Sequence, residues 1–226
     1  MRITLFTWAL SLFLLLAGCY AHTPNPPAEI AASQPGFRQD IRTPDIPKTI
    51  DFAGEAVPLD CFDVKESLIR ELSTICYWHA STMYVVKLSN RFFPIIVPIL
   101  QREGVPDDFK YLCIAESGLQ QVISPAKAVG FWQFLEQTGK EYGLEINSEV
   151  DERYHIEKAT MAACAYLKKA YEKYNSWTMA AAAYNMGNAG ADKQIDRQMQ
   201  ASYYDLLLPE ETMRYVFRIL AFKTVL

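Results

Sequence analysis

The sequence is poor in histidine and has no closely spaced cysteine pair, and both shortages argue against a metal site. Its three histidines, His22, His79 and His155, are scattered along 226 residues, and neither an HExxH nor a CxxC spacing occurs. These spacings are the usual sequence marks of zinc sites. We therefore expect no metal and no other cofactor.

Clustered positive charge is also missing. The chain has 22 Lys and Arg residues against 26 Asp and Glu residues, a formal net charge of −4, and no stretch in which basic residues gather. Proteins that bind nucleic acid or acidic lipid through charge need such a stretch, because Lys and Arg supply the electrostatic affinity. We expect no nucleic-acid partner.

The N-terminal run between Arg2 and Cys19 has no charge at all. Residues 3–18 number 16, fewer than the ~20 that span a bilayer as a helix, and with the preceding Arg they predict a secretory signal peptide over residues 1–18. The final LAGC resembles the bacterial lipobox, which implies lipid attachment to Cys19; an ordinary signal peptide with an incidental cysteine is the alternative. We expect export and a lipid anchor in the cell envelope. Tyr20, in place of Asp, favours the outer membrane, facing the periplasm.

Proline is concentrated in the segment that follows. Seven of the 12 prolines lie between residues 20 and 58, and Pro-rich sequence with few apolar residues buries too little surface to order itself. We expect residues 19–59 to form a lipid-anchored linker. The remaining residues, 60–226, suit one domain with one hydrophobic core.

Four cysteines follow Cys19, in what would be an oxidising compartment where disulfides can form. Cys61 and Cys76 should bracket one helix and lie ~20 Å apart, which is too far for a bridge between them. For Cys113 and Cys164 we expect buried free thiols, with a disulfide between two packed helices as the alternative.

Helical signals dominate from residue 60 onward, and the predicted fold class is mainly α. Pro106 and Gly118 mark the start and end of one helix. Ser176 is suited to cap another that ends near Gly187, in which the four alanines 180–183 favour close helix packing. The stripe Ala159, Ala163, Leu167, Ala170 and Tyr174 indicates a further helix, and Met213, Val216, Phe217 and Leu220 indicate one face of a last helix opened by Pro209.

One acidic residue, Glu116, is followed by a long stretch that contains no Asp or Glu. The 19 residues 117–135, directly after Glu116, contain no Asp or Glu, and the nearest acid upstream is Asp108. In the last turn of its helix, Glu116 should have a raised pKa, because the helix dipole and apolar neighbours both disfavour its charge. A carboxylic acid that stays protonated near neutral pH can protonate a departing glycosidic oxygen. An ordinary solvent-facing glutamate at a helix end is the alternative.

Three short motifs favour the catalytic interpretation. ESGL begins at Glu116, GFWQF at Gly130 and AAYNMG at Ala182. In this order they resemble the motifs of the lytic transglycosylase domain of the soluble-lytic-transglycosylase type, which is related to goose-type lysozyme. Tyr215 matches a tyrosine in the last helix of that family. The resemblance implies a lysozyme-like helical domain that cleaves the MurNAc–GlcNAc bond of peptidoglycan.

The resemblance also implies roles for single residues, with Glu116 as the sole catalytic acid and base. Aromatic rings and amides suit the flat faces and hydroxyls of sugars, and glycine at 130 would let the backbone approach the ligand closely. For at least one of Trp132 and Phe134 we expect core packing instead. The substrate-binding positions implied are Ser117 beside the acid, Gly130, Trp132 and Gln133 in the cleft wall, Tyr184 and Asn185 facing the catalytic carboxyl and the sugar, and Tyr215 closing the site.

The isolation of Glu116 bears on the reaction, because most glycosidases need two carboxylates. In the resembling family the substrate's own N-acetyl group is thought to stabilise the oxocarbenium-like state, and its 6-hydroxyl attacks to leave a 1,6-anhydroMurNAc end. Two alternatives stay open. One is a muramidase that hydrolyses with a more distant acid such as Glu149 or Asp151; the other is a catalytically inactive glycan-binding lipoprotein.

Two features depart from the family's pattern. Lys127 stands where relatives often have glycine, which leaves the shape of its loop open. The sequence also ends soon after the last expected helix, without the LysM wall-binding repeats that many relatives carry. We expect affinity for peptidoglycan strands to come from the cleft itself or from a partner.

Overall fold

The computed structural model describes residues 44–226, and this part of the chain is mainly helical, as predicted. The predicted signal peptide over 1–18, the lipidation residue Cys19 and most of the predicted linker lie outside the described residues. The elements in chain order are β1 (Asp51–Phe52), β2 (Glu55–Ala56), α1 (Phe62–Tyr77), α2 (His79–Arg102), α3 (Phe109–Ser117), α4 (Glu136–Glu141), the 3-10 turn η1 (Glu152–Tyr154), α5 (Ile156–Tyr174), α6 (Trp177–Met186), α7 (Asn188–Gln198), the 3-10 turn η2 (Tyr203–Asp205) and α8 (Glu210–Val225).

The folded part begins before the predicted boundary at residue 60. β1 and β2 pair as an antiparallel hairpin whose two turn residues both have positive φ, as tight hairpin turns require. Phe52 is fully buried, and its ring meets the ring of Phe109 edge-on with centroids 5.2 Å apart. The linker prediction is therefore wrong for this hairpin, because the proline content of residues 20–58 conceals a short apolar segment near its end.

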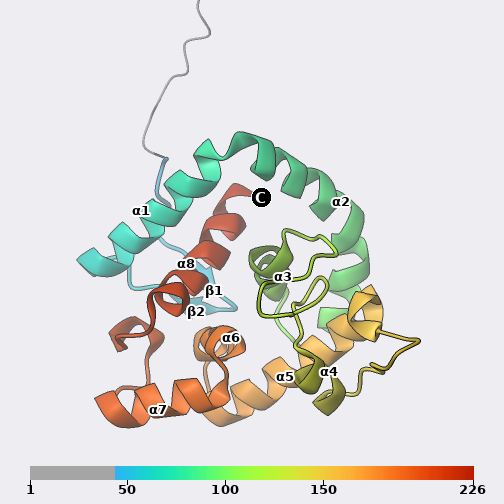
Figure 1. The fold of residues 1–226 in the computed structure, drawn as a ribbon. Helices are drawn as coiled ribbons and strands as arrows, with labels where there is room; N and C mark the ends of the chain where they lie inside the picture. The colour runs from blue at the N-terminus through green and yellow to red at the C-terminus, as the bar shows by residue number, and fades with distance from the viewer. Residues whose placement is uncertain (1–43) are drawn as a thin grey trace, which may run out of the picture. The chain divides into compact units, whose positions relative to one another are not determined.

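α1 and α2 follow one another in an arc above α3 and α8 (Figure 1). α1 packs along α8, and α2 packs along α5. Trp78 stands at the junction, between the last residue of α1 and the first of α2. α2 is long and apolar enough to span a membrane by composition alone, but it contributes a row of side chains to the core of this domain. The buried apolar residues of α2 are Val85, Leu88, Ile96, Ile99 and Leu100.

The helix ends follow the sequence signals closely. The Ser176 hydroxyl accepts a hydrogen bond from the Met179 backbone N–H at 3.2 Å and so caps α6, which ends before Gly187. α3 ends before Gly118, whose φ of 60° is the left-handed conformation common after helices. The predicted apolar stripe of α5 is buried except for Tyr174, which is partly exposed.

Two details of the helix predictions are wrong. Pro106 lies before α3 and not in its first turn, because the two aspartates that follow it form a separate turn. On α8, Met213 is 37% exposed, whereas Val216, Phe217 and Leu220 are buried as predicted. Thr212 and Tyr215 near it are buried, so Met213 lies at the edge of the buried face of α8.

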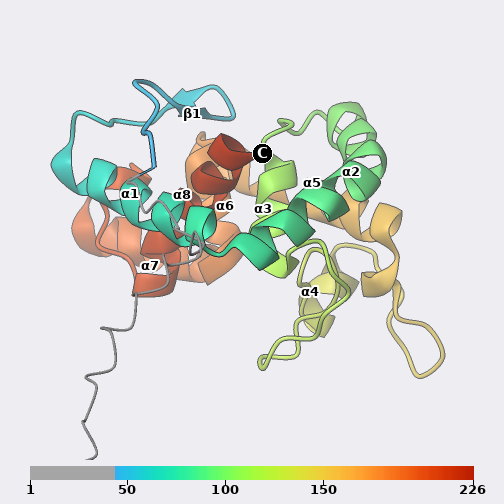
Figure 2. The ribbon, with the colours of Figure 1, turned by 90° about the horizontal axis from the view of Figure 1, so that it is seen from above.

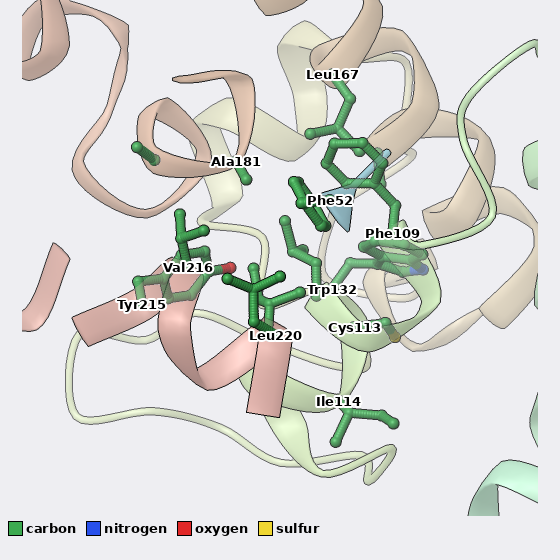
Figure 3. Close-up of a cluster of buried hydrophobic side chains, with 14 of the residues drawn as sticks. Phe52, Phe109, Cys113, Ile114, Trp132, Leu167, Ala181, Tyr215, Val216 and Leu220 are labelled. Atoms are coloured by element: carbon green, nitrogen blue, oxygen red, sulfur yellow. The ribbon is translucent and has the colours of Figure 1, made fainter. Parts of the chain in front are cut away.

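The core lies between α3, α5, α6 and α8 (Figures 2 and 3). All four alanines from 180 to 183 are fully buried, so that α6 can lie close to α5 as predicted. α8 packs against both α3 and α6. Because α3 carries Glu116, α6 carries Tyr184 and α8 carries Tyr215, this packing brings the three predicted site residues to one region.

The cysteines of the described residues are all free. Cys61 precedes α1 and Cys76 lies in its last turn, as predicted. Cys113 and Cys164 are buried free thiols, which was the expected state of the two. Burial raises the pKa of the Cys164 thiol to about 12 and that of the Cys113 thiol well above its ordinary value, so both are unreactive packing residues.

Candidate active site

Glu116 occupies the last turn of α3 and lines a cavity of about 510 Å³, called here the Glu116 cavity. The residue keeps partial contact with solvent through the cavity, while protein atoms surround its carboxyl group. This burial raises the pKa of Glu116 to about 7. The predicted rise is confirmed, and loss of water contact is its main cause.

Three neighbours modify the charge of Glu116. The Tyr215 hydroxyl donates a hydrogen bond to Oε1 of Glu116, which stabilises the carboxylate and lowers its pKa. The positive charge of Arg218 acts in the same direction, and the negative charge of Glu211 opposes it. The resulting pKa of Glu116 is close to neutral pH, where one group can both donate and accept a proton.

The structure brings five of the eight predicted site residues to the Glu116 cavity. Gly130, Trp132 and Ser117 are not among the residues that line it. Phe134, for which core packing was considered, is buried and also forms part of the wall. The predicted residues that do line the cavity are Glu116, Gln133, Tyr184, Asn185 and Tyr215.

The two tyrosines of the cavity have different partners. Tyr184 lies on α6, and its hydroxyl donates to the backbone oxygen of Trp132 at 2.7 Å. Tyr215 lies on α8, is almost fully buried and bonds Glu116 directly. Tyr184 therefore fixes the wall of the cavity, and Tyr215 orients the acid. Sequence motifs alone do not separate these roles, since both positions are tyrosines.

Trp132 belongs to the core. Its side chain is fully buried (Figure 3), and its indole N–H donates to the Thr160 hydroxyl at 2.9 Å. Ser117 is also turned inward, with its hydroxyl donating to the backbone oxygen of Phe131 at 2.9 Å. Both residues tie the segment after α3 to the helices beneath it.

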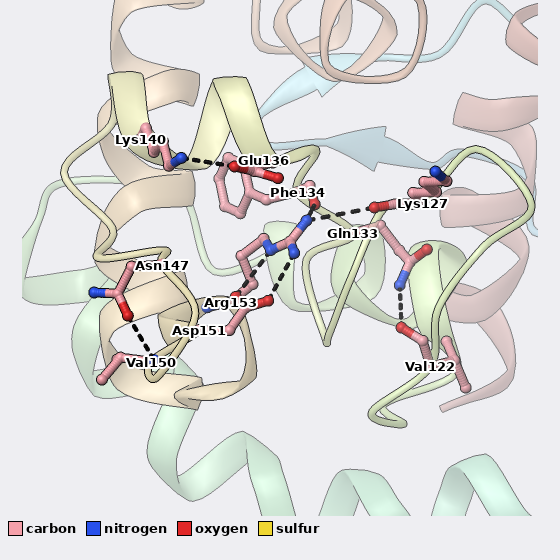
Figure 4. Close-up of polar contacts among 10 residues, drawn as sticks. All are labelled: Val122, Lys127, Gln133, Phe134, Glu136, Lys140, Asn147, Val150, Asp151 and Arg153. Carbon is pink, nitrogen blue, oxygen red and sulfur yellow. Dashed lines mark hydrogen bonds and ion pairs between the residues drawn. The ribbon is translucent and has the colours of Figure 1, made fainter.

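The structure gives Gly130 a reason other than the predicted approach to a ligand. Its φ is 82°, and a Cβ at this position would lie 2.2 Å from the backbone oxygen of Arg153. Glycine is needed at this position because two backbone segments touch. The Gln133 amide donates to the backbone oxygen of Val122 at 3.0 Å (Figure 4). It also donates to the backbone oxygen of Gly130 at 2.8 Å, and so holds the same turn from the cavity side.

Arg153 holds this segment from the opposite side. Its guanidinium forms two hydrogen bonds to the Asp151 carboxylate, at 2.6 and 2.9 Å, and also donates to the backbone oxygen of Phe134 at 3.2 Å (Figure 4). Asp151 thus forms a structural ion pair with Arg153. Glu149 is exposed on the preceding loop, and neither acid lines the Glu116 cavity.

The cavity has a second carboxylate, Glu211, which none of the sequence motifs marks. It lines the wall, and its Oε1 lies 3.1 Å from Nη1 of Arg218. Arg218 also faces Glu71, a carboxylate 2% exposed that pairs with Arg214 at 2.7 Å. The sequence spacing could have indicated this residue. Glu211, Tyr215 and Arg218 are four and three residues apart, so they share one face of a helix.

Asn185 is oriented by the same helix. Its Oδ1 accepts a hydrogen bond from the Thr212 hydroxyl at 2.7 Å, which leaves the two amide N–H donors without a partner among the described residues. A cavity with one buried acid near neutral pKa, a free amide and aromatic walls is equipped for general acid–base chemistry on a polyhydroxylated ligand. Fold and cavity together define a helical domain of lysozyme-like class.

Comparison with known proteins agrees with this class. The family described as the transglycosylase SLT domain matches residues 94–207, and the chain belongs to this family. The match includes Glu116, Tyr184 and Asn185, whereas Tyr215 and α8 lie beyond it.

Two relatives carry the name membrane-bound lytic murein transglycosylase D, one from Escherichia coli strain K12 and one from E. coli O6:H1. Each is 30% identical to this chain over 133 residues, which are 56% of this chain and 29% of the relative. The chain therefore spans less than a third of the length of these relatives.

Proposed function

We propose that this protein is a peptidoglycan lytic transglycosylase that cleaves the β-1,4 bond between MurNAc and GlcNAc without water and leaves 1,6-anhydroMurNAc ends. The observation that carries the proposal is Glu116, a single acid with a pKa of about 7 in a 510 Å³ cavity of an SLT domain. Remodelling of the cell wall is the biological role that such an activity serves.

Glu116 acts twice in this reaction. Its proton moves to the glycosidic oxygen as the bond from that oxygen to C1 of MurNAc breaks, and the N-acetyl group of the substrate stabilises the positive charge at C1. The 6-hydroxyl oxygen of the same MurNAc then bonds to C1, and its proton returns to Glu116. All atoms and protons are accounted for by the sugar and one carboxyl group, so one acid with a pKa near the working pH suffices.

Other cavity residues prepare Glu116 and the sugar. Tyr215 orients the carboxyl group through its hydrogen bond and stabilises the carboxylate that forms when the proton leaves. Asn185 offers amide donors to sugar oxygens, and Gln133 and Tyr184 shape the opposite wall. Ser117, Gly130 and Trp132 contribute from beneath that wall, by holding the segment after α3 in place.

A hydrolytic muramidase remains the second candidate, and Glu211 is the observation that favours it. This carboxylate lines the same cavity as Glu116 and could in principle activate water. Its pairing with Arg218 at 3.1 Å argues for the transglycosylase, because the ion pair engages the charge that a general base would use. Glu149 and Asp151, the acids first considered for this role, are replaced by Glu211.

Digestion of purified peptidoglycan in H₂¹⁸O separates the two reactions. We expect the new muramyl ends to be lighter than a reducing end by one water and to contain no label, since the 6-hydroxyl and not solvent attacks C1. Labelled reducing ends would identify a hydrolase, and Glu211→Gln should then abolish cleavage. No new ends of either kind from the folded protein would leave a glycan-binding module.

We further infer that the protein works in the cell envelope. The names of the relatives describe membrane-bound enzymes that act on murein, and the lipobox-like LAGC supports a diacylated Cys19. In this arrangement residues 1–18 are the signal peptide, a linker from residue 19 leads to the domain, and the catalytic domain begins with the segment before β1. The anchor would place the cavity on the periplasmic side of the outer membrane.

A further inference from the structure

Glu71 is a buried carboxylate that has no part in the reaction as described so far. It lies on α1, which packs along α8, and it is only 2% exposed. Burying a charge is costly unless partners compensate it. Nε of Arg214 lies 2.7 Å from Oε1 of Glu71, and Nε of Arg218 lies 4.0 Å from Oε2. Each carboxylate oxygen therefore faces one arginine of α8, and the half-exposed Arg70 lies 3.7 Å from Oε1.

Arg218 lies between two carboxylates that come from different helices. Its Nη1 lies 3.1 Å from Oε1 of Glu211 on α8, while its Nε faces Glu71 on α1. Arg218 also lines the cavity that contains Glu116, and its positive charge lowers the pKa of that acid. Among residues 44–226, the guanidinium pairs with these two carboxylates and not with Glu116. It is near enough to act on the acid but is held out of direct contact.

This distance between Arg218 and Glu116 suits a group that alternates between acid and carboxylate. A guanidinium in direct contact with Glu116 would keep the carboxyl group ionised, and no proton would be available for a leaving group. A guanidinium turned to solvent would give no support to the carboxylate that forms when the proton has left. An arginine side chain has many rotamers, so partners must fix its position.

We propose that Glu71 is a positioning residue for the proposed reaction, which holds the Arg218 guanidinium beside Glu116 without an ion pair between those two side chains. The inference rests on the proposed function, because only a reaction in which Glu116 gives up and regains a proton needs a cation at a fixed distance. Glu211 holds the same guanidinium from the other side, but its side chain is 63% exposed. Exposed ion pairs are weak, so the buried Glu71 supplies most of the restraint.

The sign of the expected effect follows from the charges around Glu116. Without a negative charge at position 71, the Arg218 guanidinium can turn towards the remaining carboxylates, and one repulsive charge is lost from the region. Both changes lower the pKa of Glu116. The tyrosine hydroxyls and the thiol beside Glu116 have pKa values well above their ordinary ones and stay neutral. The titratable and charged groups that face this region are Arg70 and Glu71 on α1, Cys113 on α3, Tyr184 on α6, and Glu210, Glu211, Arg214 and Tyr215 on α8.

The pKa of Glu116 in the full-length protein tests the proposal. Carboxyl ¹³C shifts of glutamate-labelled protein are followed against pH, and the Glu116 signal is assigned by its absence from Glu116→Gln protein. We expect Glu71→Gln to lower the pKa of Glu116 by roughly half a unit. The basic limb of the kcat/KM profile on purified peptidoglycan should move by the same amount, so that the rate at pH 8 falls about threefold.

Arg218→Met separates positioning from a direct effect of the Glu71 charge. In this background Glu71→Gln has no guanidinium to release, so its effect on the pKa of Glu116 should fall to less than half of the effect in the wild type. Equal effects in the two backgrounds would overturn the proposal. Glu66→Gln is the matched control, because it removes the same charge from the exposed face of α1 and should shift the pKa by less than ~0.1 unit.

Thermal unfolding shows whether each variant is folded. The side chains of Arg214 and Arg218 are 30% and 26% exposed, so water can solvate them after Glu71→Gln, and we expect this variant to fold. Glu71→Asp gives a second test, since it withdraws the charge from the arginines by one methylene and should lower the pKa of Glu116 by a smaller amount.

The inference and the proposed function can fail separately. An unchanged pKa of Glu116 in both Glu71 variants would overturn the positioning role, even if the wild type leaves anhydro ends. A lowered pKa that depends on Arg218 supports the positioning role whatever the product of cleavage is. If the wild type then proved unable to cleave peptidoglycan, the proposed function would be refuted and the link from Glu71 to Glu116 would stand.

Discussion

The carboxyl group of Glu116 experiences opposing influences from its surroundings. Burial raises its pKa to about 7, and the hydrogen bond from Tyr215 restrains that rise. A tyrosine hydroxyl that donates to a carboxylate favours the charged form, so its loss must raise the pKa further. The same hydrogen bond fixes which way the carboxyl oxygens point.

We predict that Tyr215→Phe shifts the basic limb of the kcat/KM profile to higher pH by roughly one unit. The protonated acid is needed to release the leaving group, and a higher pKa keeps Glu116 protonated to a higher pH. The maximum rate should fall, because the acid is less well oriented. Rates of turbidity loss on purified peptidoglycan between pH 5 and pH 9 measure both effects.

Tyr184→Phe serves as the control for this shift. This substitution also removes a tyrosine hydroxyl from the cavity, but the Tyr184 hydroxyl donates to the backbone of Trp132 and not to Glu116. Its basic limb should stay where the wild-type limb lies, even if its rate is lower. A limb that moves equally in both variants would show that Tyr215 has no special link to the acid.

The structure shows the backbone conformation of the loop that contains Lys127. Its φ is 64°, in the left-handed region that favours glycine. The backbone keeps the shape that a glycine would take, at a cost of about 1–2 kcal/mol for a side chain there. Hydrogen bonds of the loop, from the Lys127 N–H to Ser124 and from Arg153 to the Lys127 oxygen, offset this cost.

At the scale of elements, the β hairpin controls the start of α6. The Glu55 carboxylate from β2 accepts hydrogen bonds from the Ser176 hydroxyl at 2.9 Å and from the Thr178 backbone and hydroxyl at 3.0 and 2.6 Å. A negative charge at a helix N-terminus is favourable, since the first N–H groups of a helix have no partner within it. The helix so capped carries Tyr184 and Asn185 at its other end.

We predict that Glu55→Ala lowers the free energy of unfolding by about 2–3 kcal/mol, because several donors near a helix start lose their acceptor together. Urea unfolding followed by circular dichroism measures this. Glu66→Ala, on the exposed face of α1, should change stability by less than about 0.5 kcal/mol. Similar losses in the two variants would mean that the hairpin is not part of the cooperative fold.

How far the sequence predicts this fold depends on the range of the interactions. Helix starts and stops such as Ser176 and Gly118 are local signals, and the motif around Glu116 marks this residue as the candidate acid. The contact between Glu55 and α6 joins residues more than 120 positions apart, and no local pattern contains it. For the same reason the local sequence predicts a linker where the hairpin lies.

For the candidate site, too, the sequence predicts local features but not contacts between distant residues. The positions of the cavity residues on their helices follow from motif order, but their partners do not. A tyrosine in a motif does not tell whether its hydroxyl meets a carboxylate or a backbone oxygen, as Tyr215 and Tyr184 do. The contact that requires glycine at position 130 is with Arg153, which lies outside the local motif and farther along the chain.

At the scale of the whole molecule, the proposed lipid anchor at Cys19 would determine where the domain can act. We predict that Cys19→Ala moves the protein from the detergent phase to the aqueous phase when cells are extracted with a phase-separating detergent. Only a thiol at that position can take the diacylglyceryl group, and each buried methylene of the lipid contributes ~0.8 kcal/mol to membrane binding.

Cys61→Ala is the control for the anchor, because Cys61 is an exposed free cysteine in the folded domain. That variant should partition like the wild type. Identical partition of Cys19→Ala and the wild type would refute the lipidation, and the hydrophobic run would then be an ordinary signal peptide.

The burial of Glu116 also links the stability of the domain to pH. Its pKa is about 7 in the folded state against an ordinary value of 4.5, so the folded domain binds this proton more tightly than the unfolded chain does. The resulting stabilisation is complete below about pH 4.5 and is lost as the pH rises to 7, on the order of 3 kcal/mol in all. Above pH 7 the domain retains a charge that its interior disfavours. In the proposed reaction the same proton is passed to the leaving group, so protonation of Glu116 would favour both the folded state of the domain and the first step of cleavage.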